Sequence, residues 1–177
     1  MFDKEYSFKG SHAAKVNQLT SKFNQNGNQL FDRNFDVYLI AAIVGFIYAR
    51  KSELDKVSEP TTKIFVEMLI KEQDSLKFNY RLIMLMDKNN EPDLEKRIEK
   101  AFRLYGSPEA HADEQLYEQY VRGGIDILHE KLIVQANNED DYLKNLYDFL
   151  EEFEIRYNQS ISTDEILNLC KSVKVYN

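Results

Sequence analysis

Two pairs of side chains are of the types that bind metal ions or move protons. Asp126 and His129 are three residues apart, so a helix would place them on one face. Helical di-iron sites use such a pair from each of two helices, with Glu as the carboxylate. His111 and Glu114 have the reverse order, and Glu118 would join them one turn later. Because the first pair is single and carries Asp, we interpret both pairs as solvated helix faces and predict no cofactor, with a metal site as the alternative.

Five basic side chains are candidates for binding phosphate or nucleic acid: Arg33, Arg50, Lys51, Arg81 and Arg122. The first four, together with Lys63, would form a basic patch if the ends of the central apolar segment lay near the following helix. Arg122 precedes Gly123-Gly124, whose backbone N–H groups could hold a phosphate as a nest does. The net charge of −7 disfavours a general DNA-binding surface, which usually has a basic face. We therefore interpret the basic residues as ordinary solvated helix ends, and the glycine pair as a close helix contact or a break in a helix.

The most acidic stretch of the chain is a candidate surface for docking a partner. Residues 139–154 contain seven Asp and Glu residues and one basic residue, Lys144. Five side chains of this stretch would carry the contact: Tyr142, Tyr147, Asp148, Glu151 and Glu152. Charged rows on the wet face of an amphipathic helix are common, so the pattern alone does not distinguish docking from solvation.

Signatures of nucleophilic, nucleotide-binding and zinc chemistry are absent from the sequence. It contains no Gly-x-Ser-x-Gly, Walker A, Gly-x-Gly-x-x-Gly or His-Glu-x-x-His motif. Cys170 is the single cysteine, which excludes an internal disulfide framework and a multi-cysteine zinc site. It stands among Leu167, Leu169 and Val173, and we interpret it as a small buried apolar residue. These absences disfavour an enzyme, although many helical acid–base enzymes carry no such motif.

The elements that would position these side chains are organised around residues 37–48, the one long apolar run without charge. The run is shorter than the roughly 20 residues that a membrane span needs. Ala41-Ala42 at its centre favours a helix over a strand. We expect this helix to span residues 36–51, with Asn34 or Asp36 near its start and Arg50-Lys51 at its end. Because it is apolar all round, it should be buried on every side.

The composition favours an all-α fold. The chain has only 3 Pro and 6 Gly, too few for a turn-rich all-β protein. We expect a single domain over residues 1–177, with about six to eight helices packed around the central one. Residues 1–10 would form an irregular arm or a short extended piece. Helix starts are predicted from capping residues at Ser11, at Thr61 or Thr62, and at the capping box of residues 162–165.

These observations favour a non-enzymatic, bacterial-type cytoplasmic protein that works by binding another macromolecule. A protein partner or self-association is preferred, because 11 Tyr exceed what the core needs and Tyr is frequent at interfaces. The N-terminus has no apolar signal-peptide region, and no membrane association is expected. One alternative is an accessory nucleic-acid-binding subunit of a defence or DNA-processing assembly. The other is a helical metal- or ligand-binding enzyme.

Overall fold

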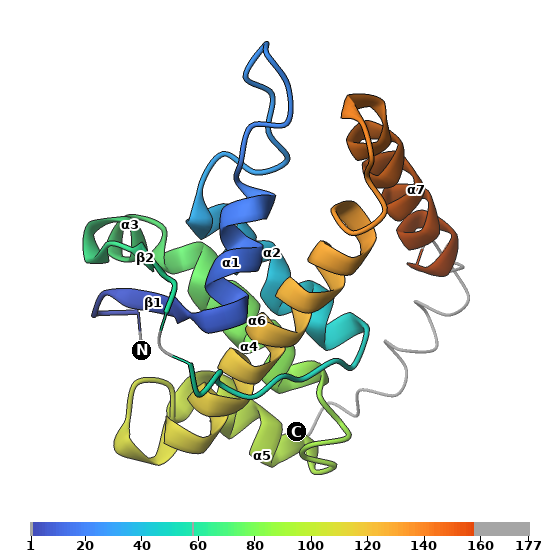
Figure 1. Ribbon diagram of the computed structural model, residues 1–177. Helices are drawn as coiled ribbons and strands as arrows, with labels where there is room; N and C mark the ends of the chain where they lie inside the picture. The colour runs from blue at the N-terminus through green and yellow to red at the C-terminus, as the bar shows by residue number, and fades with distance from the viewer. Residues whose placement is uncertain (1, 58, 158–177) are drawn as a thin grey trace.

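The protein is a helical bundle with one small sheet. The computed structural model describes residues 2–57 and 59–157, which form seven α-helices, a two-stranded sheet and two short helical turns (Figure 1). The elements are, in chain order, β1 (Tyr6–Lys9), α1 (Gly10–Leu19), α2 (Asn34–Ile47), β2 (Thr61–Ile64), α3 (Val66–Lys71), α4 (Gln73–Met86), α5 (Leu94–Ile98), a π-helical turn (Glu99–Arg103), a 3₁₀ turn (Pro108–Ala110), α6 (His111–Leu132) and α7 (Glu139–Tyr157). The predicted all-α bundle is confirmed.

The centre of the bundle is the packing of α2 against α6 (Figure 1). Both helices carry a glycine where they meet. A Cβ atom on Gly45 would lie 1.9 Å from the backbone oxygen of Tyr120, and one on Gly124 would lie 1.9 Å from that of Ala41. The two backbones are therefore in direct contact. Of the two interpretations of the glycine pair, close helix packing is confirmed, because α6 continues through it without a break.

The end of α2 differs from the prediction, which extended the helix to residue 51. The helix ends at Ile47, and Ala49 adopts the left-handed region with φ of 51°. The N–H of Ala49 donates to Phe46 at 3.0 Å, and the N–H of Arg50 donates to Gly45 at 2.8 Å. This is the hydrogen-bond pattern of a Schellman motif, with Ala where Gly is usual. The chain after Ile47 therefore turns away and crosses α6.

The apolar surface of α2 is covered on most of its sides. Val37, Tyr38, Ala41 and Ala42 are fully buried, because α1, α4 and α6 all pack on this helix. Ile40 is 44% exposed, so the prediction of burial on every side is wrong at that position. Across the described residues, no helix combines the length and apolar character that would let it cross a membrane.

The N-terminal residues form a strand, the extended alternative for residues 1–10. β1 pairs antiparallel with β2, with Phe8 opposite Thr62. Thr61 and Thr62 therefore belong to a strand, and the prediction that one of them caps a helix is wrong. Phe8 and Ile64 point inward and are buried, which ties this small sheet to the helical core.

Two other predicted helix starts have different outcomes. Lys9, not Ser11, precedes the first residue of α1, so that capping prediction is wrong. The N–H of Ser11 instead donates to the side chain of Asp55. The capping box at residues 162–165 and Cys170 lie outside the described residues.

We expect Gly124→Ala to lower the free energy of unfolding by roughly 3 kcal/mol, although Ala favours a helix by about 1 kcal/mol over Gly. The added Cβ would overlap a backbone oxygen of Ala41, which cannot rotate aside as a flexible side chain can. Urea unfolding measures the change. Gly106→Ala is the matched control: it has φ of +77° and nothing within 4 Å, so only about 1–2 kcal/mol of backbone strain applies. A Gly124→Ala protein as stable as the wild type would contradict the close contact.

Candidate functional site

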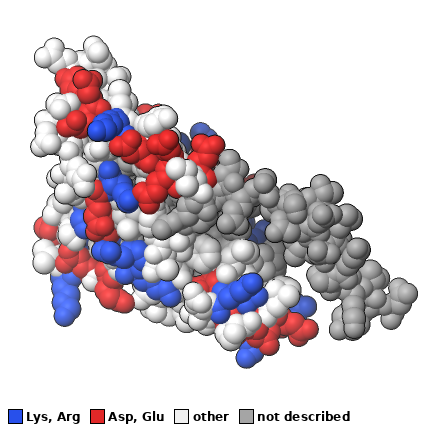
Figure 2. All heavy atoms as spheres, turned by 90° about the vertical axis from the view of Figure 1, so that its right-hand side faces the viewer, with Lys and Arg blue, Asp and Glu red and all other residues white. Residues whose placement is uncertain are grey.

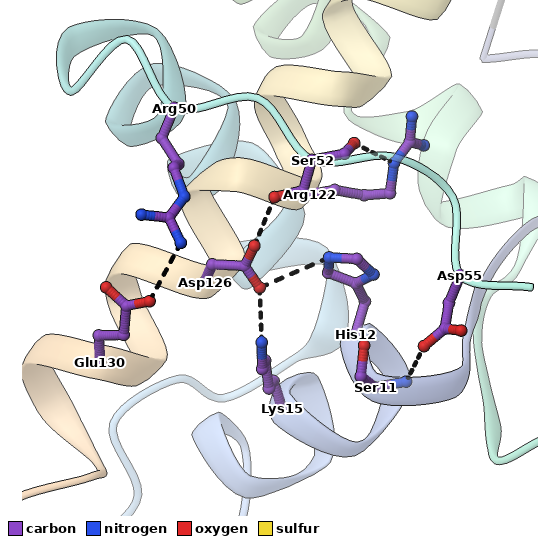
Figure 3. Close-up of polar contacts among 9 residues, drawn as sticks. All are labelled: Ser11, His12, Lys15, Arg50, Ser52, Asp55, Arg122, Asp126 and Glu130. Atoms are coloured by element: carbon purple, nitrogen blue, oxygen red, sulfur yellow. Dashed lines mark hydrogen bonds and ion pairs between the residues drawn. The ribbon is translucent and has the colours of Figure 1, made fainter. Parts of the chain in front are cut away.

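A polar cluster around Asp126 joins α6 to α1 and to the segment after α2 (Figure 3). Its Oδ1 accepts a hydrogen bond from Lys15 Nζ at 2.6 Å and lies 3.5 Å from His12 Nε2. Its Oδ2 accepts from Ser52 Oγ at 2.5 Å. The Asp126 side chain is only 10% exposed. Both oxygens of a largely buried carboxylate therefore have partners.

The segment after α2 lies directly on α6. The N–H of Ser52 donates to the carbonyl of Gln119 at 3.1 Å, and its own carbonyl accepts from Arg122 Nε at 2.9 Å. A Cβ atom on Gly123 would lie 2.0 Å from the backbone oxygen of Arg50. The missing side chain at Gly123 thus lets this segment approach α6 and brings Ser52 to the Asp126 cluster.

The start of α1 is fixed by Asp55. Its carboxylate accepts from the N–H of Ser11 at 2.9 Å and from the N–H of Val57 at 3.0 Å. These backbone hydrogen bonds lower the pKa of Asp55 to about 2. With its first turn anchored in this way, α1 presents His12 and Lys15, three residues apart, to Asp126 (Figure 3).

The contacts of Asp126 decide what the cluster can do chemically. Burial by itself raises the pKa of this carboxyl, but hydrogen bonds from His12, Lys15 and Ser52 outweigh it and hold the pKa well below 3.8. Asp126 is therefore a carboxylate at neutral pH. In a Ser-His-Asp triad the histidine accepts from the serine, whereas here Ser52 donates to the aspartate directly. The cluster is an ion-pair junction between elements, not an activated nucleophile.

The four metal-ligand candidates do not form one site. His111 and Glu114 lie in the first turn of α6, and Asp126 follows His111 by 15 residues, or about 22 Å along a helix. His129 Nε2 lies 2.5 Å from Gln18 Oε1, so this ring is paired with α1. Within the part of the chain that the structure describes, no three His, Cys, Asp or Glu side chains are grouped to hold a metal ion.

The five basic candidates come from four separate parts of the chain. Arg33 precedes α2, Arg50 and Lys51 follow it, Arg81 lies in α4 and Arg122 in α6. Each also has a partner within the chain: Arg33 pairs with Asp36, Arg50 with Glu130, Lys51 lies over the ring of Tyr120, Arg81 over that of Phe102, and Arg122 donates to Ser52.

A cleft of about 420 Å³ is lined by the candidate residues in the N-terminal part of α6. Its lining residues are Glu53, Leu54, His111, Glu114, Gln115, Glu118, Gln119 and Arg122. His111, Glu114, Glu118 and Arg122 are three to four residues apart, so they line one face of the helix. The spacing in the sequence predicted that His111, Glu114 and Glu118 share a face, but it did not place Arg122 with them. The opposite wall, from the segment after α2, had no sequence signal.

Glu118 is the most perturbed acid of this cleft. Burial raises its pKa above the ordinary value of 4.5. Acting in the other direction, the Tyr38 hydroxyl donates to Oε1 at 2.5 Å, and Arg122 Nη1 lies 3.9 Å from Oε2. A carboxyl with a raised pKa at the wall of a cleft is the kind of group that transfers protons. Tyr38 was missed by the sequence analysis, because nothing marks a tyrosine inside an apolar run as a partner for a carboxylate.

The predicted docking residues on α7 divide into two sets. Tyr142 stacks on Phe23 with ring centroids 4.9 Å apart, and Glu152 accepts from Tyr48 at 3.1 Å and from Lys131 at 2.6 Å. These two residues hold α7 against the rest of the bundle. The other three predicted residues are exposed: Tyr147, Asp148 and Glu151.

An apolar groove lies between α4 and the segment that runs from α5 through the π-helical turn (residues 94–103). It encloses about 430 Å³, and we call it the α4–α5 groove. It is lined by Asp74, Lys77, Phe78, Arg81, Leu82, Leu85 and Phe102. Phe78 is 66% and Phe102 is 52% exposed, and Leu94 and Ile98 are exposed further along the same segment. Nothing in the sequence marked Leu94, Ile98 or Phe102 as part of a binding surface, so the groove is new from the structure.

No known protein family, curated protein or solved structure matches this chain. Only geometry therefore distinguishes the Asp126 cluster, the Glu118 cleft and the α4–α5 groove as candidate sites. Both carboxylate oxygens of Asp126 have partners, whereas the buried His12 Nδ1 has none among the described residues. The Glu118 cleft is lined mainly by charged and amide residues. The α4–α5 groove differs from both, since large apolar side chains gathered on a surface are the feature that usually marks a binding site.

We expect Asp126→Asn to cost roughly 3 kcal/mol of stability at neutral pH, because it removes the charge of a largely buried carboxylate to which Lys15 and Ser52 donate. The wild-type pKa is depressed, so the stabilisation is complete above about pH 4 and is lost as the pH falls through the folded-state pKa. Urea unfolding between pH 2 and 7 tests this. Glu130→Gln, which breaks the exposed pair with Arg50 on the same helix, should cost under about 1 kcal/mol. Equal losses in the two variants would contradict the assigned role.

We expect Tyr38→Phe to raise the pKa of Glu118 further, because the lost hydroxyl stabilises the ionised carboxylate. A carbon-13 NMR pH titration of the Glu118 carboxyl measures this directly. Tyr48→Phe is the control, since that hydroxyl donates to Glu152 instead. An unchanged Glu118 titration in Tyr38→Phe would show that the hydrogen bond does not stabilise the carboxylate.

Proposed function

We propose that this is a cytoplasmic, non-enzymatic protein that binds a helical segment of another protein in the α4–α5 groove. The observation that carries the proposal is the exposed apolar lining of the groove, with Phe78 at 66% and Phe102 at 52% exposure. Burial of each such side chain against a partner would contribute about 1.5–3 kcal/mol to the free energy of binding. Protein binding was also the function that the sequence analysis preferred.

The shape of the groove favours a helix as the occupant. On α4, Phe78, Leu82 and Leu85 recur at spacings of four and three, so they form one row along the helix. On the facing segment, Leu94, Ile98 and Phe102 recur at spacings of four. Two helical elements with rows of this kind form a trough that fits the apolar face of a third helix.

The distribution of charge favours protein over nucleic acid as the partner. Lys77 and Arg81 are the two basic residues of the groove lining, and Asp74 accompanies them. Arg81 is also engaged with the ring of Phe102, with its guanidinium carbon 5.3 Å from the ring centroid. A nucleic-acid site would need a row of cations that follows phosphates. This groove instead offers an apolar floor with few charges.

The proposal is tested with a photo-crosslinking amino acid placed at Leu82 in the groove. We expect ultraviolet light to yield a discrete crosslinked protein, because the partner covers this position. Adding Phe78→Asp to the same chain should abolish the product, since it places a carboxylate on the floor of the groove. The matched control is Val134→Asp, an exposed apolar residue of similar accessibility (64%) outside the groove. A product that survives Phe78→Asp, or no product at Leu82, would contradict the proposal.

A further inference from the structure

One face of the amphipathic helix α7 is largely exposed among the residues that the structure describes. Its inner face packs on the bundle through Phe149, which is buried, and through Tyr142 and Glu152. On an adjoining face, Tyr147 and Leu150 are 65% and 58% exposed, and Leu143, which lines a hollow beside residues 22–32, is 56% exposed. Their spacings of four and three place them in one row. This row has the pattern of a helix that docks in an apolar groove.

The α7 row is bordered by acidic side chains. α7 contains seven Asp and Glu residues against two basic residues, and Asp140, Asp148 and Glu151 are among its exposed ones. Figure 2 looks onto the side of the molecule on which α7 lies in Figure 1, and acidic side chains are prominent over its upper part. The helix is therefore apolar along one line and negative beside it.

The α4–α5 groove has the complementary character. Its floor is apolar, and its lining carries Lys77 and Arg81 against Asp74. Residues 71–103, which form both walls, contain eight basic and seven acidic residues, so this region is slightly positive in a chain of net charge −7. The acidic side chains of α7 are complementary in charge to Lys77 and Arg81 of the groove lining.

The chain cannot fill its own groove with α7 as it stands. α7 lies at the upper right of Figure 1, whereas α4 and α5 lie low in the bundle, and the inner face of α7 is fixed to α2 and α6. Among the described residues, Tyr147 and Leu150 take no part in those contacts and remain more than half exposed to a second molecule.

We propose that the occupant of the α4–α5 groove is α7 of a second copy of this chain. This inference rests on the proposed function, whose groove it uses, and names the partner. In this arrangement Tyr147 and Leu150 insert between Phe78 and Phe102, and the acids beside them face Lys77 and Arg81. Two copies that exchange α7 reciprocally close a two-fold dimer, whereas one-way docking continues into a chain of molecules.

The test uses two variants, each of which removes one half of the interface. Leu150→Asp changes the α7 row and leaves the groove intact, while Phe78→Asp changes the groove and leaves α7 intact. Both positions are more than half exposed, so the variants should fold, and circular dichroism with thermal unfolding checks this. Val134→Asp is the matched control at an exposed position outside both surfaces.

We expect light scattering during size exclusion to show a dimer or larger species for the wild type and for Val134→Asp. Each of the other two variants should be a monomer alone. Their equimolar mixture should form a one-to-one heterodimer, because the intact α7 of one chain meets the intact groove of the other. Weaker association at 1 M salt is also expected, since the rim contacts are ionic.

Other outcomes overturn this inference in distinguishable ways. If Leu150→Asp still dimerises, the contact does not use α7, and a groove-to-groove dimer would fit. If the wild type is a monomer at 0.5 mM, the occupant is not a second copy. The Leu82 crosslinking experiment then decides separately whether the groove binds a different protein, so the two proposals fail independently.

Discussion

The direct backbone contact between α2 and α6 is the constraint on which the other arrangements depend. With Gly45 on one helix and Gly124 on the other, the two axes approach until Cα–H groups and carbonyls touch, a contact that contributes about 0.5–1 kcal/mol each time it occurs. This approach brings Tyr38 on α2 within hydrogen-bond distance of Glu118 on α6. Gly123 extends the same contact to the segment after α2 and so places Ser52 beside Asp126. The Tyr38–Glu118 contact and the Ser52–Asp126 contact therefore both depend on the glycines at these three positions.

Glu118 and Asp126 show that the groups packed around an acid decide the direction in which its pKa shifts. They are eight residues apart on α6, so they lie on the same side of it. Glu118 meets a tyrosine hydroxyl and a guanidinium 3.9 Å away, and burial dominates, so its pKa rises. Asp126 meets an ammonium, a hydroxyl and an imidazole within 3.5 Å, and its pKa falls. The same helix therefore carries one acid whose protonated form is favoured by burial and one carboxylate that fixes the position of α1.

The sequence predicted the helical class and the central helix because those depend on local properties. An apolar run with Ala41-Ala42 at its centre is a sufficient signal for a buried helix, and few Pro and Gly are a sufficient signal against an all-β fold. Details that depend on distant residues were not predictable. The partner of Lys15 is 111 residues away, and the left-handed turn at Ala49 replaces the glycine that would have marked the end of α2. Thr61 and Thr62 have the composition of a cap and become a strand only because β1 offers its edge.

The rotation of α5 explains why the α4–α5 groove is open to solvent. A stripe of Leu94 and Ile98 would ordinarily face the core. In this helix the buried side chain is Arg97, whose Nη1 donates to the carbonyls of Glu91 and Pro92 at 2.8 and 2.9 Å. Those carbonyls belong to the turn before α5 and would be left without partners if the helix rotated the other way, at a cost of about 1–3 kcal/mol for each group. The arginine thus fixes the helix with its apolar row outward, and the exposed groove is a consequence of satisfying backbone groups in the turn.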